Sequence, residues 1–340
     1  MIDETRPHAS GEQVAVPGSL RVAAEPWQRR LATGLRARLG GRRARTTLGL
    51  LLLAAPGLLY IFVFKYVTLI GIVVAFKRYR TVDGLLGSPW VGFENFRFMF
   101  GTGAIWPVIR NTVALNLLFL MASTVVSLTI AILIAEIYRQ RVTRVYQTTL
   151  FFPQFISWVL VSYFVYALLS TEGGIINGLL RQFGIEPISW YTSPQYWPLI
   201  LLLAALWKGA GAGSLLYLAA LLGIDPQYYE AARIDGANKW QEIRYITLPL
   251  LVPVIVIQLL IAIGFIFNAD FGLFYQVPRN NAALYPVTDV LDTFVFRSLT
   301  TVGNVGMAAA AGLLQATVGF ALVLASNWLV RRWNPERSLF

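Results

Sequence analysis

The chain has 340 residues, of which 56% are hydrophobic and 13% are charged, and its mean hydropathy is +0.60. Soluble domains carry about 25% charged residues, so this composition excludes a soluble globular protein and indicates one embedded in a membrane. The sequence contains no cysteine and a single histidine, His8. Disulfides, thiolate metal sites and cysteine nucleophiles are thereby excluded, and we expect neither a metal site nor a catalytic residue.

Much of the net charge of +11 lies in the first 47 residues, ahead of the first apolar run. Seven arginines crowd directly before that run: Arg29, Arg30, Arg36, Arg38, Arg42, Arg43 and Arg45. Basic clusters can bind nucleic acid, but flanking charge beside anionic lipid is the favoured interpretation, and we expect no nucleic-acid partner. The charged region is too long for a secretory signal peptide. Residues 1–47 are therefore predicted to form a cytoplasmic tail, and residues 334–340 a second, short one.

Residues 48–333 contain apolar stretches long enough to cross a bilayer, which requires about 20 residues of helix. We predict an all-α membrane protein with six spans: Leu48–Phe76, Val113–Ile137, Thr148–Leu169, Trp197–Leu222, Leu248–Phe271 and Met307–Val330.

The orientation of these spans follows from the Lys and Arg residues in the connections between them, because cytoplasmic connections carry the excess. With the N-terminus inside, the cytoplasmic side receives Arg139, Arg141, Arg144, Arg233, Lys239, Arg244, Arg331, Arg332 and Arg337. The cluster Lys77, Arg78 and Arg80 on the opposite side contradicts this rule locally. Lys65 lies within the first span and must reach the interface or face the protein interior. Both termini are expected in the cytoplasm.

Two segments on the outer side have a pattern of their own. Ser88–Phe96 mixes aromatic and turn residues, as an interfacial segment does. Tyr285–Leu299 is expected to form a short helix packed on the mouth of the protein. Its apolar face holds Val287, Val290, Leu291 and Phe294, and its other faces hold Asp289, Asp292 and Arg297.

The connection between the fourth and fifth spans, residues 224–247, predicts two short helices. Asp225 is a natural N-cap and Pro226 suits the first helical position. Gly236 should break this helix, a second helix should run through Ile246, and Pro249 should mark where the chain passes into the membrane. The resulting cytoplasmic hairpin is expected to offer apolar surface outward through Ile234, Ile243 and Ile246.

This connection resembles the EAA loop of ABC importer permeases. The pattern E-A-A, three residues, G, nine residues, I-x-L-P is matched by Glu230, Ala231, Ala232, Gly236, Ile246, Leu248 and Pro249. The triplet Asp235-Gly236-Ala237 resembles the carbohydrate branch. The resemblance implies that these residues, with Ile243, form coupling helices seated in a cleft of an ATPase subunit, where polar contacts hold Glu230. Ile243 departs from the family, which more often has an aromatic residue there.

Further motifs are similar to permeases that import oligosaccharides derived from polysaccharides, including the alginate-type importer. They are Ser88–Gly92, Phe152–Trp158, Asp289–Thr293 and Ser338–Phe340. The resemblance implies the type I ABC importer permease fold in a bacterial inner membrane. It also implies a second homologous permease that completes a heterodimer, two ATP-binding cassette subunits and an extracytoplasmic solute-binding protein. The sequence has no G-x-x-x-x-G-K-[ST] phosphate loop, so no cofactor is expected in this chain, and ATP and Mg should bind the partner ATPases.

Polar side chains inside the apolar stretches are candidates for a sugar pathway, because intramembrane polar groups face the protein interior. They are Gln154, Trp158, Lys208, Gln258, Asn268, Asp270 and Gln315. Lys208 could bind an acidic sugar, pair with Asp270, or lie near an interface. For the three glutamines, hydrogen bonding between helices is the favoured interpretation. The glycine run Gly209–Gly213 indicates close helix packing with some flexibility.

Three alternative functions remain open from the residues. One is an importer of the same type for peptides or another polar nutrient. A second is a secondary transporter or channel driven by an ion gradient, which would need paired ionisable residues at mid-membrane and no ATPase. A third is a membrane scaffold without transport. Within the leading function, Lys208 and the cluster Lys77, Arg78 and Arg80 favour an acidic oligosaccharide.

Overall fold

The computed structural model describes residues 42–137 and 139–333. The predicted tails fall outside these residues, except that residues 42–47 already belong to the first helix. The chain divides into two compact units, Met1–Leu69 and Ile70–Phe340.

The first unit contains the start of the first predicted span. Helix α2 (Arg42–Ile61) includes Pro56 and passes into a π-helical turn, Phe62–Tyr66, that carries Lys65. The helix continues without interruption as the 3₁₀ segment Val67–Phe76, so that Thr47–Phe76 is long and apolar enough to cross a membrane. The prediction of one long span here, rather than two short ones, is confirmed.

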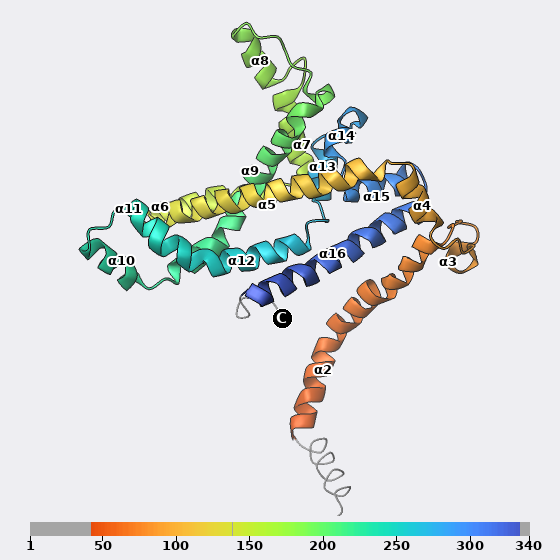
Figure 1. Cartoon of the computed structure of the whole chain (residues 1–340), viewed down its shortest axis with the longest axis horizontal. Coiled ribbons are helices and arrows are strands. Elements are labelled where there is room, and N and C mark those ends of the chain that lie inside the picture. Colours follow the sequence, from red (N-terminus) through yellow and green to blue (C-terminus); the bar gives the residue numbers. More distant parts are fainter. Residues whose placement is uncertain (1–41, 138, 334–340) are drawn as a thin grey trace, which may run out of the picture. The chain divides into compact units, whose positions relative to one another are not determined.

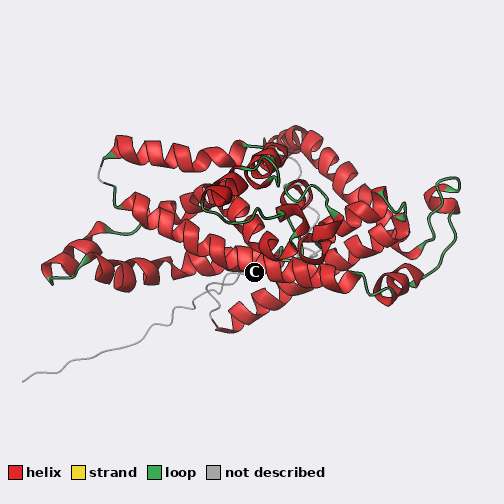
Figure 2. Cartoon of the chain, turned by 90° about the horizontal axis from the view of Figure 1, so that it is seen from above, coloured by secondary structure: helices red, strands yellow, loops and turns green. Residues whose placement is uncertain are grey.

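The second unit is formed by helices joined through short loops (Figures 1 and 2), and the described residues contain no β-sheet. Its α-helices are α3 (Gly84–Gly87), α4 (Glu94–Gly101), α5 (Ile105–Ala135), α6 (Gln140–Phe151), α7 (Trp158–Leu169), α8 (Ile175–Gln182), α9 (Trp197–Leu222), α10 (Pro226–Ile234), α11 (Lys239–Glu242), α12 (Leu248–Gly264), α13 (Phe271–Gln276), α14 (Tyr285–Thr288), α15 (Leu291–Thr300) and α16 (Val305–Trp333). Short 3₁₀ segments lie at Phe152–Phe155, Trp190–Thr192, Pro194–Tyr196 and Ala282–Leu284, and a π-helical turn lies at Ile243–Thr247.

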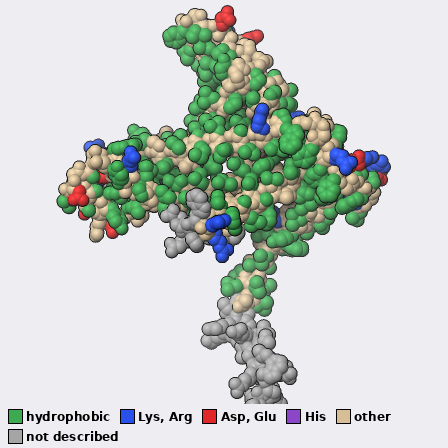
Figure 3. Space-filling view, viewed as in Figure 1, with side chains coloured by type: hydrophobic (Ala, Val, Ile, Leu, Met, Phe, Trp, Pro, Cys, Tyr) green, Lys and Arg blue, Asp and Glu red, His purple; other side chains and the backbone are tan. Residues whose placement is uncertain are grey.

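Five described helices could cross a membrane, and a sixth span results if one bent helix pair is counted as a single crossing. The fourth predicted span coincides with α9. The sixth lies within α16. The second overlaps α5, which begins before the predicted Val113, at Ile105, and ends before the predicted Ile137, at Ala135. Hydrophobic side chains cover most of the long helices in the space-filling view, and most charged side chains lie toward the ends (Figure 3). The prediction of an all-α membrane protein is confirmed.

The third span differs from the single helix predicted over Thr148–Leu169. The chain forms α6, the 3₁₀ segment Phe152–Phe155 and α7, with a bend of 97° between the two helical parts. The helical backbone continues through Pro153 to Phe155, and the bend lies at Ile156 and Ser157, which are extended with ψ angles of 131° and 149°. The hydroxyl of Ser157 then accepts from the Leu160 N–H at 3.4 Å and caps α7.

The fifth span is shorter at one end and longer at the other than the predicted Leu248–Phe271. Helix α12 ends at Gly264, and the residues up to Asp270, the N-cap of α13, are not helical. At the N-terminal end of the span, the helix is continuous from Lys239. Pro249 therefore lies inside this helix and does not begin a new one. The π-helical turn before it accommodates a residue that lacks an N–H donor.

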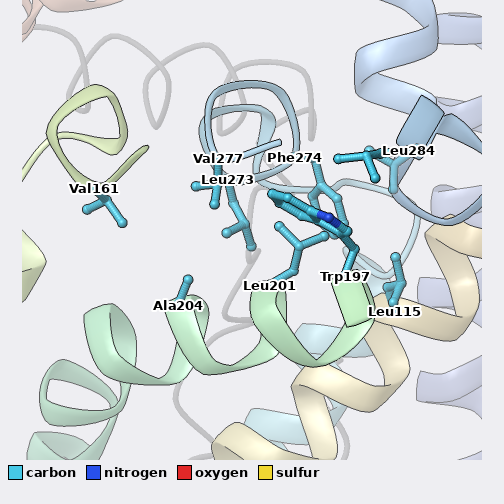
Figure 4. Close-up of a cluster of buried hydrophobic side chains, with 10 residues drawn as sticks. Leu115, Val161, Trp197, Leu201, Ala204, Leu273, Phe274, Val277 and Leu284 are labelled. Carbon is cyan, nitrogen blue, oxygen red and sulfur yellow. The ribbon is translucent and has the colours of Figure 1, made fainter. Parts of the chain in front are cut away.

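The core of the second unit lies where α9 packs along α5. Trp197 is fully buried there, among Leu201 of α9, Leu115 of α5 and Phe274 of α13 (Figure 4). Its indole N–H donates to the Trp190 carbonyl at 2.8 Å, which satisfies its polar atom. This packing joins two long helices of the unit, α5 and α9, to the short helix α13.

The glycine run in α9 packs against α6. The helix is continuous through Gly209–Gly213, so the backbone is not unwound there. A Cβ atom on Gly211 would lie 1.9 Å from the carbonyl oxygen of Leu150, whereas one on Gly209 would meet nothing within 4 Å. The predicted close packing is thus confirmed, and Gly211 is the residue that allows it.

The segment Tyr285–Leu299 forms two helices, α14 and α15, instead of one. Val290, Leu291 and Phe294 are buried as predicted. The expectation that Asp289 lies away from the buried face is wrong, because Asp289 is buried and forms a bidentate ion pair with Arg297. Burial disfavours the Arg297 cation, but the hydrogen bonds and negative charge of Asp289 outweigh burial and raise the pKa of Arg297.

Candidate functional site

The connection between α9 and α12 folds as a helical hairpin, residues Pro226–Thr247, which we call the coupling hairpin. Asp225 caps α10, since its carboxylate accepts from the Gln227 N–H at 3.0 Å. Gly236 has φ +82°, a left-handed conformation in which glycine is unstrained, and the chain reverses there. Asn238 and Gln241 form a capping box that starts α11. The predicted helix start and break are confirmed.

The tip of the coupling hairpin is exposed. Glu230, Ala231, Asp235, Gly236 and Pro249 are exposed, whereas Ala232, Ala237, Ile243, Ile246 and Leu248 are half-buried. Ile234 is 86% exposed as expected. The outward placement of Ile243 is wrong, since this residue lines a cavity of about 300 Å³ behind the hairpin. Trp240 and Tyr245 are exposed instead, so aromatic rings provide much of the apolar surface of the hairpin.

A group of charged residues lies behind the tip. Glu242 is buried and accepts from the Arg233 Nε at 2.9 Å and from the Lys239 Nζ at 3.1 Å. Lys239 also lies 2.9 Å from Glu136, the C-cap residue of α5. These contacts join both short helices of the hairpin to the end of a long one.

A cavity of about 500 Å³, the Lys208 cavity, lies between α5, α9, α13 and the bend of the third span. Its wall contains four of the seven predicted pathway residues, Gln154, Trp158, Lys208 and Asp270. Aromatic rings of Phe119, Phe155 and Phe274 also line it. The cavity thus combines flat apolar faces with hydrogen-bonding groups.

Lys208 does not pair with Asp270, contrary to one of the expectations above. Its ammonium donates to the carbonyl oxygen of Gln154 at 2.7 Å and lies 3.5 Å from that of Pro153. It also lies 5.3 Å from the centre of the Trp158 ring, a cation–π distance. Asp270 instead accepts from the Trp158 indole N–H at 2.7 Å. Lys208 therefore holds the bend of the third span through the Gln154 carbonyl, whereas the Pro153 carbonyl also accepts from the Ile156 N–H at 3.1 Å.

A second cavity of about 440 Å³, the Gln258 cavity, shares the wall residues Asn116, Phe119, Ala205 and Gly209 with the first. Gln258 and Asn268 line it. Asn268 belongs to the non-helical segment Phe265–Asp270, so this cavity has irregular backbone in its wall.

Side chains from three helices hold that non-helical segment in place. Asn116 of α5 donates to the Ile266 carbonyl at 2.7 Å. The carboxylate of Asp292 on α15 accepts from the Ala269 N–H at 2.7 Å. Gln315 of α16 donates to the Asn268 side-chain oxygen at 2.8 Å. Gln315, the seventh predicted pathway residue, also donates to Asp292 of α15 at 3.3 Å, which is the interhelical hydrogen bond that the sequence favoured.

Together the two cavities can bind a polar ligand that has apolar faces. Aromatic rings provide contact area, and amide, carboxylate and indole groups provide directional hydrogen bonds. Irregular backbone lines the cavities at the bend of the third span and at Phe265–Asp270, and within membrane-spanning proteins such backbone is tolerated around a water-filled cavity or when buried in protein.

Residues 123–335 match the family of binding-protein-dependent transport system inner membrane components. The chain belongs to this family. This permease is thus a multi-pass membrane subunit of a transport system that works with a binding protein.

Curated relatives extend the similarity over most of the permease. The polygalacturonan/rhamnogalacturonan transport system permease protein YteP of Bacillus subtilis is 34% identical over 287 residues, which cover 84% of this chain and 89% of the relative. Protein LplB of the same organism is 32% identical over 287 residues, which cover 84% of this chain and 90% of LplB.

Solved structures show the same fold. A chain of a bacterial ABC transporter that imports the acidic polysaccharide alginate has 31% sequence identity and a TM-score of 0.77, and covers 90% of this permease and 99% of that chain. The alginate transporter in complex with its periplasmic protein, which carries an alginate pentasaccharide, matches with the same TM-score and identity. The permease therefore has the predicted type I ABC permease fold.

The site also contains residues that the sequence reasoning passed over. Asn116 and Asp292 hold the non-helical segment, and Arg233 and Glu242 hold the coupling hairpin. Asn116 carried a usable signal, since it is an amide in an otherwise apolar stretch. Glu242 carried none, because an acidic residue in a charged loop is ordinarily exposed.

Proposed function

We propose that this permease forms one half of the translocation pathway of an ATP-driven oligosaccharide importer. The observation that carries the proposal is the pair of adjoining cavities, in which aromatic rings alternate with amide, carboxylate and indole groups. Sugars present apolar ring faces and hydroxyl groups, and such a wall matches both. Relatives whose names specify polygalacturonan/rhamnogalacturonan and alginate support the same substrate class.

The other half of the pathway would come from a second, homologous permease. Only 17% of the most apolar window of α5 is buried within the chain, and 28% of that of α9. The remaining apolar surface must face lipid or another subunit, and Gln154, Asn268 and Asp270 at the cavities are exposed. A heterodimer that covers these cavities is therefore part of the proposal.

The energy would come from two ATPase subunits that bind ATP and Mg on the cytoplasmic side. We place the coupling hairpin on that side, with both termini, because Arg233, Lys239 and Arg244 belong to it. Its exposed tip, with Glu230 and Ala231, has the form of a small knob that can seat in a groove of a partner. An extracytoplasmic binding protein would deliver the oligosaccharide to the opposite side.

The charge of the oligosaccharide is a separate question. Lys208 already donates to two backbone carbonyls, and each member of the outer basic cluster has a partner of its own. Lys77 donates to the carbonyls of Leu85 and Leu86, Arg78 pairs with Glu94, and Arg80 lies 3.9 Å from Asp83. These contacts weaken the argument from charge for an acidic substrate, and the similarity to the alginate importer remains in its favour.

The test is substrate-stimulated ATP hydrolysis by the reconstituted importer. The complex, with its binding protein, is placed in vesicles and given oligogalacturonides, neutral galacto-oligosaccharides or a peptide mixture. We expect an oligosaccharide to stimulate hydrolysis and to enter the vesicles. Equal stimulation by the acidic and neutral sugars would contradict a preference for acidic oligosaccharides. Stimulation only by peptides would overturn the assignment of oligosaccharides as the substrate class.

The same vesicles separate this function from ion-driven transport. Uptake that needs an ion gradient and no ATPase subunit would overturn the proposal, as would a purified permease that binds neither ATPase nor oligosaccharide-loaded binding protein. Empty vesicles and vesicles without ATP provide the baselines.

A further inference from the structure

Glu242 is a buried acid behind the coupling hairpin. Only 4% of its side chain is exposed, and each carboxylate oxygen has a cationic partner, Arg233 on one side and Lys239 on the other. A buried carboxylate is tolerated only when it is paired in this way. Because Arg233 belongs to α10 and Glu242 to α11, the ion pair joins the two short helices of the hairpin.

Lys239 extends this contact to a long helix. Its ammonium lies 2.9 Å from Oε2 and 3.2 Å from Oε1 of Glu136, which is 103 residues earlier in the chain and caps the end of α5. Helix α5 also lines both cavities through Asn116 and Phe119. A continuous row of charged groups thus runs from α10 to the helix that forms the cavity wall.

A second contact joins the hairpin to the other wall. The hydroxyl of Tyr229 on α10 lies 3.0 Å from that of Thr247, in the turn that leads directly into α12. Helix α12 carries Gln258 and ends at the non-helical segment with Asn268. Helix α10 is therefore attached to both α5 and α12. Farther along their lengths, these two helices line the cavities.

We propose that Glu242 and Lys239 are positioning residues that make the coupling hairpin move as one body with α5 and α12. This inference rests on the proposed function of the hairpin as the contact with the ATPase. A displacement of α10 by the ATPase is then delivered to the cavity wall, instead of being absorbed by bending at Gly236. The two residues contact neither ATP nor oligosaccharide.

The Lys239–Glu136 pair is half-exposed, and such pairs contribute little to folding. Its removal should therefore leave the permease folded while loosening the hairpin from α5. Glu242→Gln is the complementary change, because glutamine keeps an acceptor for Arg233 and presents an NH₂ group, which cannot accept, to Lys239. An exposed acid away from the network, Glu172, provides the matched control Glu172→Gln.

The absence of cysteine allows spin labels to be placed without background. Labels at Tyr228→Cys on α10 and Leu133→Cys on α5, both exposed, report the distance between the hairpin and α5 in the purified complex. We expect one narrow distance distribution that stays the same when Mg-ATP is added. Glu136→Gln and Glu242→Gln should broaden it about twofold or shift it with Mg-ATP, and Glu172→Gln should not.

The coupling ratio gives the functional measurement. In vesicles, oligogalacturonide uptake per ATP hydrolysed should fall about threefold in Glu136→Gln and Glu242→Gln, at a temperature where both variants remain folded. Unchanged distances and an unchanged ratio in Glu136→Gln would overturn the inference. If no ATPase attaches even to the unaltered permease, the proposed function fails, while the distances in the nucleotide-free permease still decide whether the network holds the hairpin.

Discussion

The indole N–H of Trp158 lies 2.7 Å from the carboxylate of Asp270. The first residue begins α7 after the bend of the third span, and the second ends the non-helical segment after α12. The bond therefore joins the two irregular parts of the backbone across the Lys208 cavity. Gly272 makes room for it, since a Cβ atom there would lie 2.2 Å from the indole ring.

Replacing Asp270 by alanine should destabilise the permease. The change removes the bond to Trp158 and also the cap of α13, where the carboxylate accepts from the Leu273 N–H at 3.3 Å. A lost cap costs about 1 kcal/mol and a lost charged hydrogen bond about 1.5–3 kcal/mol, less where the site is exposed as here. We expect the free energy of unfolding to fall by about 2 kcal/mol, measured as a lower midpoint of thermal unfolding in detergent.

The matched variant is Asp270→Asn, which keeps an acceptor oxygen for one of the two donors and presents an NH₂ group, which cannot accept, to the other. It should lie between the unaltered protein and the alanine variant. Equal midpoints for all three proteins would contradict the structural role assigned to the Trp158–Asp270 bond.

The glycine run of α9 offers a test within three residues. Gly211→Ala places a methyl group 1.9 Å from the Leu150 carbonyl, so α6 and α9 must separate. Overpacking of this kind costs about 1–3 kcal/mol. Gly209→Ala meets no atom within 4 Å and should leave the unfolding midpoint unchanged or slightly raised. A similar midpoint for both variants would mean that α9 does not approach α6 this closely.

Lys208→Met separates a structural from a substrate-binding role. Methionine keeps the apolar stem but gives the carbonyls of Pro153 and Gln154 no donor, so the free energy of unfolding should fall by about 2 kcal/mol. Thermal unfolding and vesicle uptake are measured together. Loss of uronate uptake with an unchanged midpoint and normal uptake of neutral sugars would instead assign the ammonium to the substrate.

Glu230→Ala should spare the fold and weaken the complex. The side chain is exposed and has no hydrogen bond within the part of the chain that the structure describes, so the unfolding midpoint should not change. Loss of its polar contacts should reduce the affinity for the ATPase at least about tenfold, about 1.4 kcal/mol. Quantitative co-purification measures the loss, with Glu172→Ala as the control. Intact, fully coupled complexes would rule out a role for Glu230.

The sequence predicted best where local chemistry decides the structure. Trp197–Leu222 was predicted to the residue because turn residues flank a mostly apolar run. The start of α10 followed from a cap and a proline, and its end from a glycine with positive φ. Six of the seven predicted pathway residues line the two cavities. A polar side chain in an apolar stretch is costly in lipid, and it therefore faces the protein interior or a cavity.

Prediction from the sequence failed where contacts between residues far apart in the chain decide the structure. Pro153 alone did not indicate a 97° bend, because proline is tolerated in many membrane helices and the bend depends on Lys208, 55 residues later. Asp289 was placed on an exposed face because its partner Arg297 lies eight residues ahead and beyond one helical turn. The half-buried position of Ile243 followed from the charge network behind the hairpin, which has no local signature.

The bend of the third span has a consequence for how the chain enters the bilayer during synthesis. Helices α6 and α7 have 12 residues each, about 18 Å at 1.5 Å per residue, so neither is long enough to cross alone. The Gln154 carbonyl between them accepts from an ammonium that is translated later, in α9. We therefore expect the third crossing to enter the bilayer together with α9 and not before it.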